Sequence, residues 1–255
     1  MNRWSVTCAL AILFTGLWPT QVQGEDARQI VTEALNRARS KSEHYEGTLE
    51  VMNPKQKVST KRWIYDRLGA YGDSKAVLRF EAPAEVKDVA LLMINHPDRA
   101  SDQWMWIPAE ERDRRIALQD RSTRFFGTDF SFEDLEERDV DQYSYTLVGE
   151  DNLDGVACWK IESRPRKGKS SQYTSSFWWI RKDNYVITRL DNYDKEKLVR
   201  RINYKDIKLI GGIWTALTAE VAETQRNSRT LLKLDKVEYN LAMKDTAFSR
   251  EALRR

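Results

Sequence analysis

The residue types that usually perform acid–base, nucleophilic or metal chemistry are few and scattered in this sequence. The two histidines, His44 and His96, stand far apart, and neither belongs to a spacing typical of metal ligands. Cys158 lies within a strand-like run and not at an activated position. The sequence contains neither a nucleophile elbow nor a glycine-rich phosphate loop. We therefore expect no enzyme and no cofactor, and a lipid-modifying hydrolase is the least favoured hypothesis.

Acidic residues gather near the middle of the chain, where they offer oxygen ligands for calcium. The run lacks the loop spacing with a central glycine that dedicated calcium sites use. Such a run is more often a solvated face or a docking surface for a basic partner, so we expect no bound metal. Its members are Asp129, Glu133, Asp134, Glu136, Glu137, Asp139 and Asp141.

Two groups of cations flank this acidic run. Arg112, Arg114 and Arg115 precede it, and we expect them to pair with its carboxylates through modest, salt-sensitive attractions. The loop 164–171 carries four cations among serines. Contact with anionic lipid headgroups or with a transporter is one interpretation of that loop, and a flexible solvated turn is the favoured one.

Apolar side chains form the more informative pattern. Trp104 and Trp106 share one face of an expected strand while Met105 and Ile107 share the other, so both faces of that strand are apolar. Other runs show the same two-sided character. This surplus of apolar surface predicts a ligand cavity, whereas the competing interpretation is that the second face packs against a helix or loop.

Residues 125–135 carry enough aromatic side chains to act as a mobile lid over such a cavity. The alternative is that Ser131 and Asp134 merely cap a short helical turn. Assignment of residues to the cavity depends on strand parity, because a one-residue slip turns every side chain to the other face. The candidate ligand-binding residues of the cavity and lid are Trp63, Leu78, Phe80, Leu92, Ile94, Trp104, Trp106, Phe125, Phe126, Phe130, Phe132, Trp159, Phe177 and Trp179.

One helix and a long series of strands must position these residues. Ile30, Ala34 and Leu35 recur at helical spacing within 26–40. Beyond residue 40 the period changes to two, as at Leu49 and Val51. The expected strands include 76–80, 89–95, 103–107, 143–148, 156–163, 175–180, 185–190, 198–210, 213–223 and 230–239.

Short turns such as 152–155 and Gly211-Gly212 leave no room for crossover helices. We predict a mainly β protein with one long N-terminal helix, in which a curled antiparallel sheet forms an incomplete, open β-barrel. No composition break divides the chain, so we expect a signal peptide at 1–24, one domain at 25–255, and a monomer.

The first residues are typical of a secretory leader. Arg3 precedes an apolar run, 5–18, that is too short to span a bilayer, and small residues allow cleavage after Gly24. A membrane anchor is the alternative. We expect a soluble periplasmic protein in which removal of the leader, with its Cys8, leaves only Cys158, so that no internal disulfide forms. With 42 basic against 39 acidic residues, the charge balance gives no support to a nucleic-acid partner.

Four segments in this order carry a resemblance to a known family. They are a tryptophan-bearing strand ending in proline at 103–108, an arginine-rich strand at 112–116, Phe-Gly-Thr-Asp-Phe-Ser-Phe-Glu-Asp-Leu at 126–135, and Asp-Gly at 154–155 followed by Cys-Trp at 158–159. The chain resembles the outer-membrane lipoprotein-sorting family, related to the periplasmic carrier LolA and often associated with transporters of the RND or MMPL type. It departs from that family's pattern at Asp88 and at Glu110-Glu111.

The resemblance implies a LolA/LolB-like open barrel around a helix, closed by a helix and loop lid, with a hydrophobic cavity for acyl chains. It implies a periplasmic carrier, acting as a chaperone for a lipid or lipoprotein, that delivers its ligand between membranes or to an RND-type inner-membrane transporter. The ligand stays open among lipoproteins, phospholipids and sterol-like molecules. The competing hypothesis is an interaction scaffold whose barrel is filled by its own side chains and whose loops dock a transporter complex.

Overall fold

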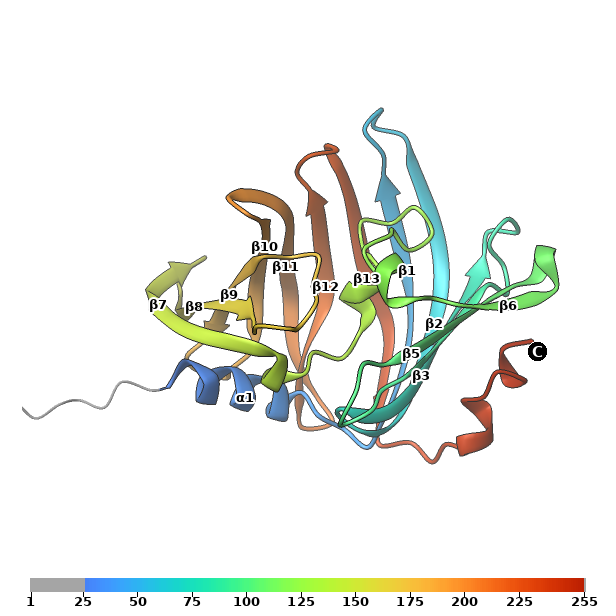
Figure 1. The fold of residues 1–255 in the computed structure, drawn as a ribbon, viewed down its shortest axis with the longest axis horizontal. Helices are drawn as coiled ribbons and strands as arrows, with labels where there is room; N and C mark the ends of the chain where they lie inside the picture. Colours follow the sequence, from blue (N-terminus) through green and yellow to red (C-terminus); the bar gives the residue numbers. More distant parts are fainter. Residues whose placement is uncertain (1–25, 255) are drawn as a thin grey trace, which may run out of the picture.

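Residues 26–254 are described by a computed structural model, in which one curled antiparallel sheet surrounds a single α-helix (Figure 1). The predicted signal peptide at 1–24 lies outside the described residues. None of the helices between residues 26 and 254 has the length and apolar character of a membrane span.

The helix and the strands follow the predicted order closely. The strand expected at 185–190 begins two residues late, at Ile187, because the preceding turn extends to Tyr185, whose φ is 63°. The elements are α1 (Ala27–Arg37), β1 (Ser42–Met52), β2 (Val58–Ala70), β3 (Asp73–Ala82), β4 (Ala90–Ile94), β5 (Asp102–Ile107), β6 (Arg112–Arg115), β7 (Tyr143–Leu153), β8 (Val156–Pro165), β9 (Ser175–Arg181), β10 (Ile187–Asp194), β11 (Lys197–Ile210), β12 (Ile213–Glu223) and β13 (Ser228–Tyr239).

Across the described residues, thirteen strands form one sheet in the order β6-β5-β4-β3-β2-β1-β13-β12-β11-β10-β9-β8-β7. Neighbouring strands are antiparallel, and the edge strands β6 and β7 do not pair with each other, so the barrel stays open. This confirms the predicted fold class. The sheet consists of two meanders that meet where β1 pairs with β13.

The strand order places an unusual demand on the connection between β6 and β7. These strands are consecutive in the chain but lie at opposite edges of the sheet. Residues 116–142 therefore cross from one edge to the other, and they do so over the concave face (Figure 1). The topology thus puts an irregular segment where a closed barrel would have its interior.

The helix α1 covers one half of the concave face. Its first turn is capped by Asp26, whose carboxylate accepts a hydrogen bond of 3.0 Å from the backbone N–H of Arg28. Ile30 and Val31 are buried in one cluster with Trp159, as the helical spacing of the apolar residues requires. The remaining half of the concave face is left to the crossing segment.

The C-terminal segment covers part of the opposite, convex face (Figure 1). Phe248 and Leu253 are buried there against Leu92, Trp104 and Trp106. A loop-like segment on the second face is the competing interpretation that the two-sided apolar pattern allowed. For β4 and β5 that interpretation is the one that the structure shows.

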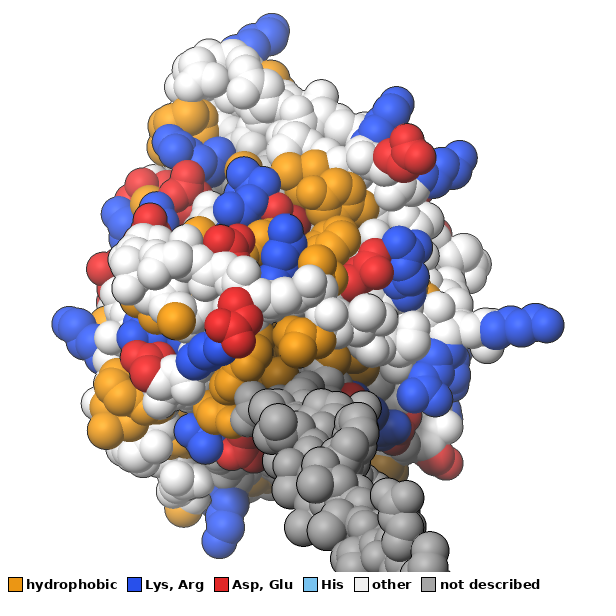
Figure 2. All heavy atoms as spheres, turned by 90° about the vertical axis from the view of Figure 1, so that its left-hand side faces the viewer, with side chains coloured by type: hydrophobic (Ala, Val, Ile, Leu, Met, Phe, Trp, Pro, Cys, Tyr) orange, Lys and Arg blue, Asp and Glu red, His pale blue; other side chains and the backbone are white. Residues whose placement is uncertain are grey.

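Charged side chains of both signs are interspersed among hydrophobic ones on the side of α1 and β7 (Figure 2), in keeping with the near balance of charge in the sequence. The expected pairing of Arg112 and Arg115 with the central acidic run is wrong. Arg112 pairs with Glu110 and Arg115 with Asp102, which are closer along the chain or on the neighbouring strand β5, and both arginines lie on the exposed edge strand β6.

Candidate functional site

Residues 124–135, which we call the plug, fill the half of the concave face that α1 leaves open. Phe125 and Phe132 are 2% and 5% exposed, whereas Phe126 and Phe130 are half-buried. The Phe125 ring stacks on Phe80 of β3 with centroids 5.4 Å apart and meets Phe132 edge-on at 5.5 Å. The phenylalanine rings of the plug therefore fill the space in which the sequence predicts an apolar cavity.

The plug is a tight reversal of the chain. An isolated antiparallel bridge joins Arg124 to Ser131. Between them Phe126 and Gly127 both have positive φ, of 44° and 74°. Glycine adopts this left-handed conformation without steric cost, which explains the Phe-Gly pair at the turn. The reversal leaves both arms of the plug on the sheet with their rings facing it.

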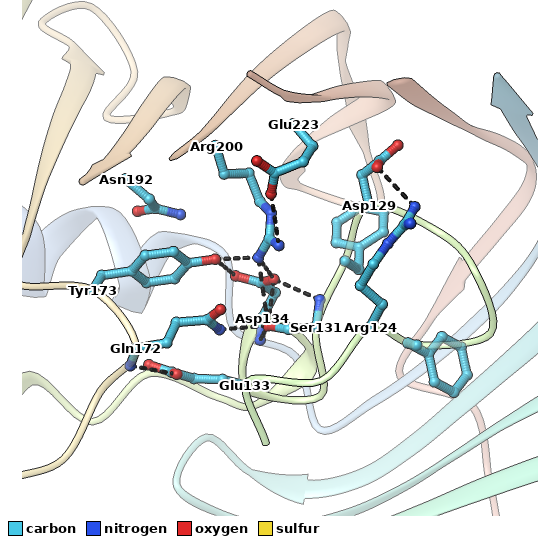
Figure 3. A network of polar contacts seen from close by, with 12 residues as sticks. Arg124, Asp129, Ser131, Glu133, Asp134, Gln172, Tyr173, Asn192, Arg200 and Glu223 are labelled. Carbon is cyan, nitrogen blue, oxygen red and sulfur yellow. Dashed lines mark hydrogen bonds and ion pairs between the residues drawn. The ribbon is translucent and has the colours of Figure 1, made fainter. Parts of the chain in front are cut away.

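A buried ion pair attaches the plug to β11 (Figure 3). The Arg200 guanidinium contacts the Asp134 carboxylate, and their side chains are only 5% and 6% exposed. Tyr173 donates to Oδ1 of Asp134 at 2.8 Å, and the Ser131 hydroxyl donates at 2.6 Å to Oδ2, the oxygen that Arg200 contacts. Arg200 also lies 3.4 Å from Glu223. Both charges are thus compensated out of contact with water.

A second group of polar contacts attaches the plug to β13. Asp129 is fully buried, and its carboxylate accepts hydrogen bonds from Ser228 at 2.5 Å and Thr230 at 2.8 Å. Arg124 contacts the same carboxylate at 2.9 Å from within the plug (Figure 3). We call the contacts of Asp129 with Ser228 and Thr230, together with those of Asp134 with Tyr173 and Arg200, the latch. The latch is polar and directional, unlike the apolar walls beneath the rings.

The exit from the plug is also tied down by carboxylates. Glu133 accepts a hydrogen bond of 2.9 Å from the backbone N–H of Gln172. Glu136 contacts Arg121 and accepts a hydrogen bond of 3.0 Å from Gln103. Burial raises the pKa of Glu136 to about 7, against the opposing effect of Arg121. Three carboxylates of the acidic run, those of Asp129, Asp134 and Glu136, thus pair with arginines outside β6.

The raised pKa of Glu136 predicts a pH-dependent stability. The folded state favours the protonated form, whereas an unfolded glutamate titrates near about 4.3. The contribution of Glu136 to stability is therefore greatest below about pH 4.3 and falls as the pH rises towards 7. Glu136→Gln should lack this fall when free energies of unfolding are measured by urea titration from pH 4 to 8. Superimposable pH profiles of the two proteins would refute the assignment.

A cleft of about 900 Å³ opens beside the end of the plug, between α1, the segment that crosses from β6 to β7, and the connections β2–β3, β4–β5 and β8–β9. Its lining is rich in charged and polar side chains, including Arg39, Glu133, Glu136 and Lys169. Water can therefore reach the exit from the plug, while the rings of the plug stay buried. The cleft lies next to the half of the interior that the plug occupies, and it is distinct from the apolar cavity that the sequence predicts.

Eight of the fourteen candidate ligand-binding residues line the interior. Trp159 lies on the α1 side. The other seven surround or form the plug: Trp63, Leu78, Phe80, Phe125, Phe126, Phe130 and Phe132.

The remaining six lie on the convex face, so the fourteen do not form one cavity lining. Leu92, Ile94, Trp104 and Trp106 pack with the C-terminal segment. Phe177 and Trp179 lie beneath the Lys160 ammonium, at 5.5 and 5.1 Å from its nitrogen. The cause is strand parity, since successive side chains alternate between faces. The neighbouring wall residues Leu91, Met93 and Met105 face the plug instead, and the polar latch was not foreseen.

The histidines stay apart, as their spacing in the sequence indicates. His44 lies between Asp66 and Glu46, and His96 pairs with Asp102. Within residues 26–254 no three histidine, cysteine or carboxylate side chains gather into a cluster suited to a metal ion.

Comparison with known proteins places this architecture. The model of a family described as "Uncharacterized protein" matches residues 72–255. No curated protein matches the chain. An outer membrane lipoprotein-sorting protein domain from Vibrio parahaemolyticus has a TM-score of 0.85 at 24% identity, covering 90% of this chain and 98% of its own.

Two further solved structures are similar over most of their length. A DUF1329 family protein from Desulfovibrio piger has a TM-score of 0.85 at 28% identity, covering 89% of this chain and 97% of its own. A LolA superfamily protein from Nitrosomonas europaea has a TM-score of 0.70 at 16% identity, covering 89% and 99%. At these TM-scores all three are similar to this chain in fold.

Proposed function

The chain belongs to the family whose model matches residues 72–255 and has a LolA-like fold, and from these premises we propose that it is a carrier that shelters an acyl-chain ligand on its concave face. The ligand is a lipid or the acyl chains of a lipoprotein. The carrier binds it without covalent chemistry or a cofactor. In this proposal the plug is the lid, and it leaves the concave face when the ligand enters.

The observation that carries the proposal is the way in which the plug is held. Its phenylalanine rings fill an apolar trough walled by Trp63, Phe80 and Leu91, yet the segment itself is attached by the polar latch. An acyl chain that replaces the rings also excludes water from the trough. Each CH₂ group that it buries contributes about 0.8 kcal/mol to the binding free energy. Displacing the plug offsets part of that gain, so binding is reversible.

The wider role rests on the predicted leader and on the resemblance in sequence. We propose export to the periplasm, a soluble monomer, and transfer of the ligand between membranes or to an RND-type inner-membrane transporter. The Vibrio parahaemolyticus neighbour, described as a lipoprotein-sorting protein domain, supports this direction through its fold.

Weakening the latch should raise the affinity for acyl chains. Thr230→Val keeps the shape of the side chain but removes its hydrogen bonds to Asp129, at a cost of about 0.5–1.5 kcal/mol to the closed state. If the ligand selects the open state, the apparent Kd falls by about 2- to 12-fold. Binding of dansyl-undecanoic acid, followed by fluorescence, measures the change.

Thr215→Val is the matched control, because Thr215 is also buried and hydrogen-bonded, to Tyr239, but does not contact the plug. This variant should bind as the unaltered protein does. If neither the unaltered protein nor Thr230→Val takes up the probe, the carrier proposal is wrong.

One observation favours a second candidate, a scaffold that docks a transporter complex. The interior is already filled, with Phe125 and Phe132 almost inaccessible. A scaffold needs no opening of the plug. Native mass spectrometry of the protein purified from a periplasmic fraction distinguishes the two functions. A co-purifying lipid supports the carrier. A protein that is purified without lipid and does not bind added fatty acids supports the scaffold.

A further inference from the structure

Lys61 of β2 has a covered side-chain stem, and its ammonium has no ion-pair partner among residues 26–254. The residue is only 9% exposed, and its ammonium makes no ion pair or hydrogen bond with any side chain or carbonyl among residues 26–254. It lies opposite Leu49 of β1, which packs in the same cluster as the plug. Lys61 therefore lies on the plug-facing side of the sheet.

Trp63, two residues along the same strand, also lacks a polar partner. It is 4% exposed, and its indole Nε1 is buried with no hydrogen-bond acceptor. Because side chains two apart on a strand share a face, the indole and the Lys61 ammonium belong to one surface. The indole lies over Gly47, where a Cβ would come within 2.9 Å of the ring, so a glycine at that position makes room for it.

Both unsatisfied groups are donors, and one is charged. A lysine ammonium that loses part of its contact with water is stabilised when an anion pairs with it. Burial lowers the pKa of the Lys61 ammonium, and no carboxylate opposes this effect. The buried arginines Arg67 and Arg200 have Glu43 and Asp134 as partners. What is missing beside Lys61 is an anionic acceptor.

We propose that Lys61 and Trp63 bind the anionic head group of an amphiphile whose acyl chain takes the place of the plug. The head group carries a carboxylate or a phosphate, which accepts hydrogen bonds from the ammonium and the indole N–H together. This inference deepens the proposed function and rests on it. It assigns the carrier to acidic amphiphiles and not to neutral lipids such as sterols or esters.

The test compares one chain with and without its charge. Equilibrium dialysis measures the affinities for dodecanoate and for its uncharged methyl ester, both below their aggregation limits. The unaltered protein should prefer dodecanoate by at least about tenfold, the factor that 1.4 kcal/mol represents. Lys61→Met should abolish this preference and leave ester binding unchanged, whereas Lys61→Arg should retain it.

Three controls sharpen the result. Lys205→Met removes an exposed lysine paired with Glu220 and changes the net charge equally, so it should keep the preference. Trp63→Phe keeps an aromatic ring but removes the N–H, and should reduce the preference even if Lys61→Met fails to fold. Acetate and inorganic phosphate, which lack a chain, should not displace dodecanoate if the head group binds only as part of an amphiphile.

The outcomes are distinguishable. Equal binding of dodecanoate and its ester by the unaltered protein overturns the head-group site and leaves the carrier intact. Binding of neither compound overturns the carrier itself. Displacement of dodecanoate by inorganic phosphate alone also overturns the proposal, since Lys61 would then hold a free anion.

Discussion

Arg200→Met is expected to lower the free energy of unfolding by about 3–5 kcal/mol, because it leaves the buried Asp134 carboxylate without its counter-charge. Tyr173 and Ser131 still donate to that carboxylate, but neither neutralises it. Urea denaturation at pH 7, followed by circular dichroism, measures the loss. Because the plug is attached through Asp134, the variant should also become more susceptible to proteolysis within 124–135.

Two comparisons make this prediction specific. Arg229→Met breaks an exposed pair with Glu220 and should cost less than about 1 kcal/mol. In the double variant Arg200→Met, Asp134→Leu both charges are gone, so it should be more stable than Arg200→Met alone. If Arg200→Met loses no more stability than Arg229→Met, the ion pair does not hold the plug.

Phe125→Ala and Phe80→Ala should each cost about 3–5 kcal/mol without ligand, because both rings are almost fully buried and stack on one another. Saturating dodecanoate should separate them. Phe125 belongs to the plug, so its truncation favours the open state and strengthens ligand binding. Phe80 belongs to the wall, so its truncation weakens binding.

Thermal unfolding with and without dodecanoate measures this difference. The ligand should restore most of the stability that Phe125→Ala loses and little of what Phe80→Ala loses. Equal responses of the two variants would mean that Phe125 is an ordinary core residue and that the plug does not make way for the ligand.

The sequence predicts the elements better than the faces. At Leu49 and Val51 the strict alternation identifies a strand with one buried face, and the structure agrees. At Leu91 and Leu92 the alternation disappears, because the plug covers one side and the C-terminal segment the other. Both positions are then apolar, so the sequence does not indicate which of the two side chains faces the interior.

The sequence predicts the plug but not the latch that holds it. The segment 125–135 is visible as a candidate lid from its aromatic content alone. Its anchors are not, because Asp134 meets Arg200 only after the chain has crossed the sheet. A meander predicts that consecutive strands pair, but it does not predict that β1 pairs with β13, and that pairing decides where the crossing segment runs.

The seam between β1 and β13 has a consequence for how the chain folds. Each half of the sheet is a series of local hairpins, whereas the seam joins Glu43 to Tyr239 and Met52 to Arg229. Contacts of such long sequence separation form late and slowly. A chain that is made from its N-terminus exposes the free edge of β1 until residues 228–239 have been synthesised. During that interval β1 is open to pairing with other chains, so the seam sets the period in which the protein most needs protection from aggregation.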